Sequence, residues 1–145
     1  MTDSSVVTRR AVHVRSAVPT FLAADVAATV RWYVQNLGFR VSGHVPDREP
    51  YVYASLQRDA AEIMLLSLAD YRKPDLTSLR PSGLWDAYVR LDGVGSLYAT
   101  VHGKPFVKMP LRKQSYGDWE FEVLDPNGYV LTFGGDGDLV EDAGR

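Results

Sequence analysis

The chain has 145 residues, which suits one compact domain with a sizeable core. Hydrophobic residues make up 46% of it and charged residues 23%, values that argue against wholesale disorder. The net charge of −2 gives no electrostatic case for binding nucleic acid. The absence of cysteine excludes disulfides, thiolate nucleophiles and zinc–thiolate sites.

The N-terminal segment carries no targeting signal. Residues 1–10 are polar with two arginines, and the apolar stretch of a signal peptide does not follow. No apolar run approaches the roughly 20 residues that a membrane-spanning helix needs. These features predict a cytoplasmic protein with no membrane partner. Residues 1–15 are predicted to form a loose arm, in which Val12 and Val14 alternate with polar residues and indicate a short terminal strand.

A first unit of structure is predicted over residues 16–68. The apolar run at 17–23 indicates a strand, and Asp25 is a good N-cap for the helix that follows, because its carboxylate can accept free backbone N–H groups. Apolar residues recur at helical spacing up to Gly38, which is expected to end the helix. Three further strands are predicted at 39–45, 51–58 and 62–68.

The same order of elements returns after a proline-containing linker at 69–83. Within a second unit, residues 84–134, a strand is followed by Asp92 as a second acidic cap and by a helix that ends at Gly103. Residues 135–145 form an acidic tail that is expected to fray. Strands are predicted at 85–91, near 106–109, at 119–124 and at 129–134, the last two joined by the turn Asp125-Pro126-Asn127-Gly128.

Three segments resemble a known superfamily. They are Ser16–Phe39 (SAVPTFLAADVAATVRWYVQNLGF), Trp85–Ala99 (WDAYVRLDGVGSLYA) and Tyr116–Phe133 (YGDWEFEVLDPNGYVLTF). Together they resemble the vicinal oxygen chelate superfamily, which includes glyoxalases, bleomycin-resistance proteins and dioxygenases, and they are most similar to the bleomycin-resistance type. The resemblance implies an α+β fold of two βαβββ modules that form a curved mixed sheet with a cleft. It also implies a homodimer that commonly exchanges an N-terminal strand and binds an antibiotic between subunits without degrading it.

Metal-dependent members of this superfamily place four His, Gln or Glu ligands on the cleft floor, one on each of four strands. Matching the segments puts Val18, Leu66 (or its neighbour), Asp86 and Thr132 at these places. Aliphatic side chains cannot bind a cation and a threonine hydroxyl is a poor ligand, so only Asp86 could serve. We therefore predict neither a metal nor another cofactor. The histidines match none of the ligand places and are expected at the surface: His13, His44 and His102.

Strand alternation predicts which side chains face the cleft. Ala87, Val89, Phe121 and Val123 suit a core, which turns their polar strand neighbours to the other face. Aromatic residues of both modules would add stacking surface. The predicted ligand-binding residues are Tyr51, Tyr53, Trp85, Asp86, Tyr88, Arg90, Tyr116, Trp119, Glu120, Glu122 and Thr132. This mixed wall of acidic groups, tyrosine and one arginine suits a cationic, aromatic ligand; a simply solvated sheet face is an equal alternative.

Two departures from the drug-binding relatives reduce the expected stacking area. Asp86 stands where those proteins use a tryptophan, and Gly43 stands where they use a phenylalanine. Tyr116 keeps an aromatic plane where they have a Trp-Gly pair. The basic segment 104–113 is predicted to be a loop that closes over the cleft or lies at a dimer rim.

Three functions remain open at this stage. The first is a metal-independent protein that binds a bleomycin-like antibiotic and acts by sequestration. The second is a superfamily enzyme of the lyase, isomerase or dioxygenase type, in which Asp86, Glu120 or Tyr116 would act as acid or base on a small substrate. The third is a dimeric structural or regulatory partner with no ligand.

Overall fold

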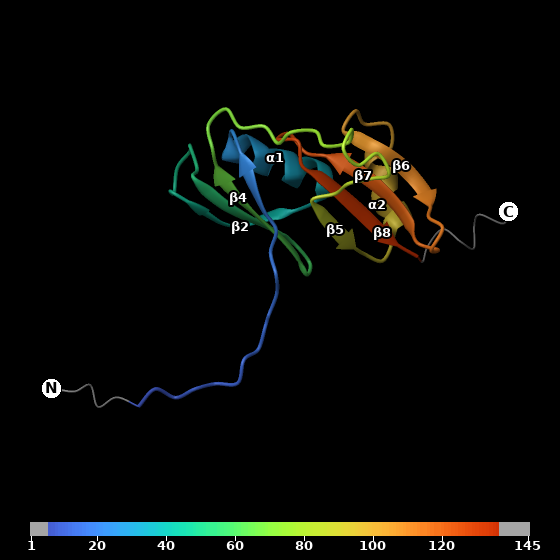
Figure 1. The fold of residues 1–145 in the computed structure, drawn as a ribbon. Helices are drawn as coiled ribbons and strands as arrows, with labels where there is room; N and C mark the ends of the chain where they lie inside the picture. Colours follow the sequence, from blue (N-terminus) through green and yellow to red (C-terminus); the bar gives the residue numbers. More distant parts are fainter. Residues whose placement is uncertain (1–5, 137–145) are drawn as a thin grey trace.

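The computed structural model describes residues 6–136, which form two modules with the same order of elements (Figure 1). The predicted α+β fold of two βαβββ modules is confirmed. The first module consists of β1 (Thr20–Ala23), α1 (Val26–Leu37), β2 (Arg40–Val45), β3 (Tyr53–Arg58) and β4 (Ala61–Ser67). The second consists of β5 (Ala87–Arg90), α2 (Val94–Val101), β6 (Val107–Lys113), β7 (Trp119–Leu124) and β8 (Val130–Gly135).

Each module builds its own four-stranded mixed sheet. Sheet 1 has the order β1-β4-β3-β2, and sheet 2 has the order β5-β8-β7-β6. The first strand of each module pairs in parallel with the last one, and the other pairs are antiparallel. A parallel pair needs a crossover connection, and here the helix after the first strand begins that crossover. One face of each sheet therefore packs under its helix.

The N-terminal arm runs away from both modules (Figure 1). Residues 6–19 contain neither helix nor strand, so the short strand predicted near Val12 and Val14 is not formed. Val12 is 92% exposed and Val14 is 78% exposed, because the arm finds no sheet edge to pair with in its own chain. The predicted fraying of the acidic tail concerns residues 137–145, which lie outside the described residues, as do residues 1–5.

The two helices begin in different ways. Asp25 caps α1 as predicted, since its carboxylate accepts a hydrogen bond of 3.0 Å from the Ala28 amide, and Gly38 ends the helix at φ 69°. The prediction that Asp92 caps α2 is wrong. The N-cap is Gly93, at φ 79° and with no side chain to accept a bond. Glycine adopts this left-handed conformation at little cost, so the chain turns into α2 one residue later than expected.

The basic segment after α2 is mostly strand rather than loop. β6 extends to Lys113 and lies at the edge of sheet 2, where Pro110 is tolerated because its missing N–H faces no neighbour. The loop predicted over 104–113 is correct only to Phe106, and the strand predicted near 106–109 begins at Val107 and extends further than expected. Two register shifts interrupt the pairing of β6 with β7, one between Val107 and Met109 and one between Met109 and Arg112.

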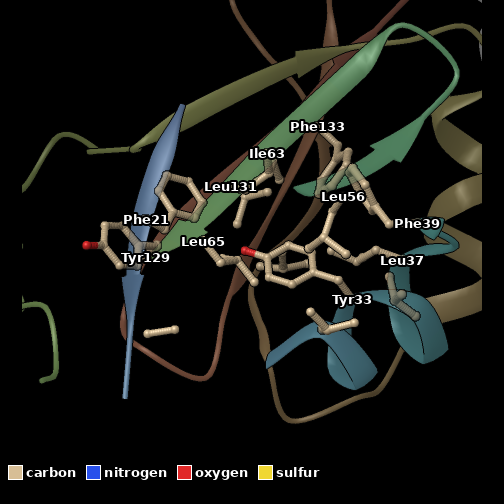
Figure 2. Close-up of a cluster of buried hydrophobic side chains, with 14 of the residues drawn as sticks. Phe21, Tyr33, Leu37, Phe39, Leu56, Ile63, Leu65, Tyr129, Leu131 and Phe133 are labelled. Carbon is tan, nitrogen blue, oxygen red and sulfur yellow. The ribbon is translucent and has the colours of Figure 1, made fainter. Parts of the chain in front are cut away.

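One hydrophobic core joins the modules. Figure 2 shows Phe21 of β1 beside Tyr129, which precedes β8, and the two rings stack at 4.2 Å between centroids. Tyr33 of α1 is fully buried and lies among residues of both sheets. Close packing of this kind fixes how one module sits on the other.

The turn between β7 and β8 is the polar part of the same junction. The Tyr33 hydroxyl donates to the Asp125 carboxylate over 2.8 Å, and the Ala24 amide donates to Asn127 Oδ1 over 3.1 Å. The linker also contacts this turn, because the Lys73 amide donates to the Asn127 carbonyl over 2.8 Å. Within the described chain, no helix is long and apolar enough to cross a membrane.

Candidate functional site

The site is built on the face of sheet 2 that α2 does not cover, here called the open face. Register places Tyr88, Thr132 and Glu122 in one row across the strands, and Arg90, Gly134 and Glu120 in the next. Phe121, Val123 and Phe133 point the other way into the core. The predicted alternation of these strands is therefore correct for both glutamates.

Two tyrosines hold Glu120. Tyr88 donates its hydroxyl to Glu120 Oε2 over 2.5 Å, and Tyr116 from the β6–β7 hairpin donates to the same oxygen. Burial and then the hydrogen bond to Glu120 raise the pKa of Tyr116 to about 12, and the same causes raise the pKa of Tyr88. Both hydroxyls therefore stay protonated at neutral pH and act as donors to the carboxylate.

Gly134 makes the contact between Tyr88 and Glu120 possible. A Cβ atom at Gly134 would collide with the Tyr88 hydroxyl and lie 2.7 Å from its Cζ. Only glycine leaves room for the phenol to cross β8 and reach Glu120 on β7. Sequence reasoning missed this residue, because a glycine at the end of a strand carries no signal of what passes over it.

Aromatic rings lie next to Glu120 and the two tyrosines that donate to it. Trp85 is 45% exposed and meets Tyr88 edge-on at 5.6 Å between ring centroids. Tyr116 is 63% exposed, although its hydroxyl is engaged. The Arg90 guanidinium lies 5.1 Å above the Tyr88 ring and 3.8 Å from Asp118. These rings offer an accessible stacking surface beside a fixed negative charge.

Glu122 lies in the neighbouring row and is differently placed. It is only 8% exposed, and its charged neighbour is Lys108, whose Nζ lies 4.0 Å from Oε1. Burial raises the pKa of Glu122, and Lys108 partly opposes that rise. Opposite it on β8, the buried Thr132 hydroxyl has no hydrogen-bond partner among the described residues.

The charge of the open face differs from the prediction. The sequence suggested acidic groups with a single arginine, but β6 adds Lys108 beside Glu122 and Arg112 opposite Glu120. The register shifts in β6 place Arg112 opposite Glu120, an arrangement that strand alternation alone does not foresee. Three carboxylates thus meet three cations on this face: Asp118, Glu120 and Glu122 with Arg90, Lys108 and Arg112.

The carboxylate of Asp86 is already occupied by contacts within the protein. Its Oδ2 accepts a hydrogen bond of 2.8 Å from the Val130 amide and lies 3.2 Å from Lys73 Nζ. These contacts fix the start of β5 to β8 and to the linker, so Asp86 serves structure rather than offering a free carboxylate.

Several predicted ligand residues lie elsewhere. Tyr51 stacks on His44 at 4.3 Å and lines a hollow beside α1, whereas Tyr53 pairs with Leu66 on the uncovered face of sheet 1. Strand alternation from Tyr51 to Tyr53 would put both tyrosines on one face, but the chain bends at Val52 before β3 begins and separates them. Trp119 alternates with Glu120 and packs against the core, so it does not line the open face.

Residues 11–133 match the sequence profile of the Glyoxalase/Bleomycin resistance protein/Dioxygenase superfamily. The chain belongs to this superfamily. No curated protein matches it. The match spans both modules, which agrees with the confirmed fold.

Solved structures of several proteins share the fold at low identity. A bleomycin-binding protein from Streptomyces verticillus, complexed with copper(II)-bleomycin, is 21% identical, with 88% of this chain and 100% of that chain covered and a TM-score of 0.61. The bleomycin resistance determinant encoded on the transposon Tn5 is 20% identical, with coverage of 86% and 100% and a TM-score of 0.61. TioX from Micromonospora sp. ML1 is 18% identical, with coverage of 83% and 94% and a TM-score of 0.64.

The donor set does not fit the metal that some superfamily members hold. Leu66 and Val18 offer no donor atom, and Asp86 is already bound by Lys73 and the Val130 amide. Among residues 6–136, no three His, Asp or Glu side chains come together as a metal site would require. We derive no step of function through a metal.

Proposed function

We propose that this protein binds a cationic, aromatic small molecule of the bleomycin type on the open face of sheet 2 and acts by sequestration. The observation that carries the proposal is the pairing of exposed aromatic rings with a held carboxylate. Trp85 and Tyr116 are accessible for stacking, and Glu120 between Tyr88 and Tyr116 is a fixed negative charge. Protection would follow from lowering the free ligand concentration, with no bond made or broken.

Likeness in fold to a bleomycin-binding protein and to a bleomycin resistance determinant supports the choice of ligand class. Isothermal titration calorimetry of the purified protein with metal-free bleomycin tests it. We expect saturable heat with micromolar affinity and loss of most of that affinity in Trp85→Ala. The absence of heat at tens of micromolar protein would remove bleomycin as the ligand.

The proposal includes a homodimer. The arm carries exposed valines, and the uncovered face of sheet 1 carries Val45 at 53% exposure and Leu66 at 42%. A second copy of the chain would cover these apolar residues and enclose the open face between subunits. Light scattering after gel filtration tests this: we expect twice the chain mass, and a monomer at tens of micromolar would contradict it. The double change Val12→Asp, Val14→Asp is expected to weaken the dimer.

An enzyme remains the second candidate, and one observation favours it. The raised pKa of Glu122 makes its carboxyl better suited to accept a proton near neutral pH than an ordinary surface glutamate. The acid–base residues named from the sequence are less suitable, because Asp86 is ion-paired and the Tyr116 hydroxyl already donates to Glu120. Turnover of a small substrate by the wild-type protein, with loss of that turnover in Glu122→Gln, would establish this alternative.

A further inference from the structure

The carboxylates of the open face are not equivalent as partners for a ligand. Glu120 already accepts two tyrosine hydroxyls, Asp118 lies beside Arg90, and Asp86 at the start of β5 is held by Lys73 and a backbone amide. The carboxylate of Glu122 accepts no hydrogen bond from any of the residues that the structure describes, although it is 8% exposed. Its oxygens are not among the fully enclosed atoms that lack a partner, so they reach solvent, and a ligand on the open face can contact them.

Its neighbour across the sheet is a buried hydroxyl that has no hydrogen-bond partner in the described chain. Thr132 pairs with Glu122 in the β7–β8 ladder, is fully buried, and leaves its hydroxyl without a partner among residues 6–136. Two adjacent polar groups therefore lie on the floor of the open face with hydrogen-bonding capacity unused. Such positions mark where a polar group from outside the chain is expected.

Lys108 lies beside Glu122 but does not donate a hydrogen bond to it. Its Nζ lies 4.0 Å from Oε1, which is an ion pair but beyond hydrogen-bonding distance. The same Nζ lies 3.5 Å from Thr77 Oγ1 in the linker, and Thr77 in turn donates to Asp75 over 2.6 Å. Lys108 can therefore give up Glu122 and keep an oxygen partner and a nearby carboxylate on the linker side.

We infer that Glu122 is the carboxylate that receives the cationic nitrogen of the ligand, an amidinium or ammonium, and that Lys108 is the internal counterion it displaces. This inference rests on the proposed ligand site but not on bleomycin as its occupant. A planar amidinium offers several N–H donors in a fixed geometry, so it can hydrogen-bond to Glu122 where Lys108 only approaches. The displaced Lys108 moves to the Asp75–Thr77 turn.

The experiment compares benzamidinium with benzamide, which has the same shape and no charge. Amide NMR titration of the full chain measures binding to wild type, Glu122→Gln and Lys108→Met. Glu49→Gln is the matched control, because Glu49 is an exposed carboxylate paired with Arg31, beside α1 and outside the open face. We expect benzamidinium to bind wild type and the control equally, tenfold or more weaker to Glu122→Gln, and several-fold tighter to Lys108→Met.

Each result has a distinct meaning. Equal binding of benzamidinium and benzamide, or unchanged binding in Glu122→Gln, overturns the inference. Weaker binding in Lys108→Met overturns the displacement of Lys108. If bleomycin binds wild type and Glu122→Gln equally, the inference fails and the proposed function stands. If benzamidinium binding depends on Glu122 but bleomycin does not bind, the inference stands and bleomycin is the wrong ligand. Circular dichroism of Glu122→Gln verifies that it folds, and Lys108→Met tests the same contact independently.

Discussion

The hydroxyl of Tyr33 donates a hydrogen bond of 2.8 Å to the Asp125 carboxylate, and this bond ties the helix of the first module to the last turn of the second. Asp125 is 2% exposed and also accepts the amides of Asn127 and Tyr129 over 2.8 and 2.9 Å. Burial raises the pKa of Asp125, and these three donors oppose that rise. The turn is thus a structural junction as well as a hairpin.

Replacing Tyr33 with phenylalanine should destabilise the fold. The change removes one donor from a buried carboxylate, and hydrogen bonds to charged groups contribute about 1.5–3 kcal/mol. Urea unfolding followed by circular dichroism measures the loss. Tyr98→Phe is the matched control, because the Tyr98 hydroxyl makes no hydrogen bond within the described chain. Equal stability of the two variants would contradict the role given to this bond.

Gly134→Ala should displace Tyr88 from Glu120. The added Cβ would overlap the Tyr88 hydroxyl, and overpacking of this kind costs about 1–3 kcal/mol. In a Tyr88→Phe background, Gly134→Ala should lower the free energy of unfolding by less, because the hydroxyl oxygen that clashes most is absent. Urea unfolding of the four proteins gives the coupling between the two sites. Strict additivity would show that Tyr88 does not lie over Gly134.

Glu120→Gln should make Tyr116 easier to ionise. Burial and the bond to Glu120 raise the pKa of Tyr116 to about 12, so removing the negative charge should lower it toward the ordinary value of 10.0. Ultraviolet absorbance of the phenolate during an alkaline titration follows the change, with Tyr116→Phe assigning the signal. An unchanged titration would mean that Tyr116 does not reach Glu120 in solution.

Glu122 should make stability depend on pH. Its pKa in the folded protein is raised above 4.5, so the folded state holds this proton more tightly than the unfolded chain does. As pH rises from 4.5 through the raised value, the free energy of unfolding should fall relative to that of Glu122→Gln, which does not titrate. Urea unfolding at a series of pH values measures the difference, with Glu49→Gln as control. A free energy of unfolding that rises with pH relative to that of Glu122→Gln would have the opposite sign and refute the assignment.

The sequence by itself determined the repeated order of elements and the superfamily. Asp25 and Gly38 mark the ends of α1, and the alternation of Phe121 and Val123 with glutamates assigned both faces of β7. These features depend on neighbours in the chain, so local propensity and periodicity can predict them. The same reasoning failed at Asp92, because the choice between it and Gly93 depends on a backbone angle rather than on residue type.

Only the tertiary structure decided which polar groups meet on the open face. Register shifts in β6 place Arg112 opposite Glu120. Gly134 admits Tyr88, and Asp86 is held by a lysine from the linker. Tyr51 and Trp119 were placed wrongly for a related reason: a bend at Val52 and packing against the core turned them away from the site. Register and contacts across the chain are set by the packing of the whole domain, and no short stretch of sequence specifies them.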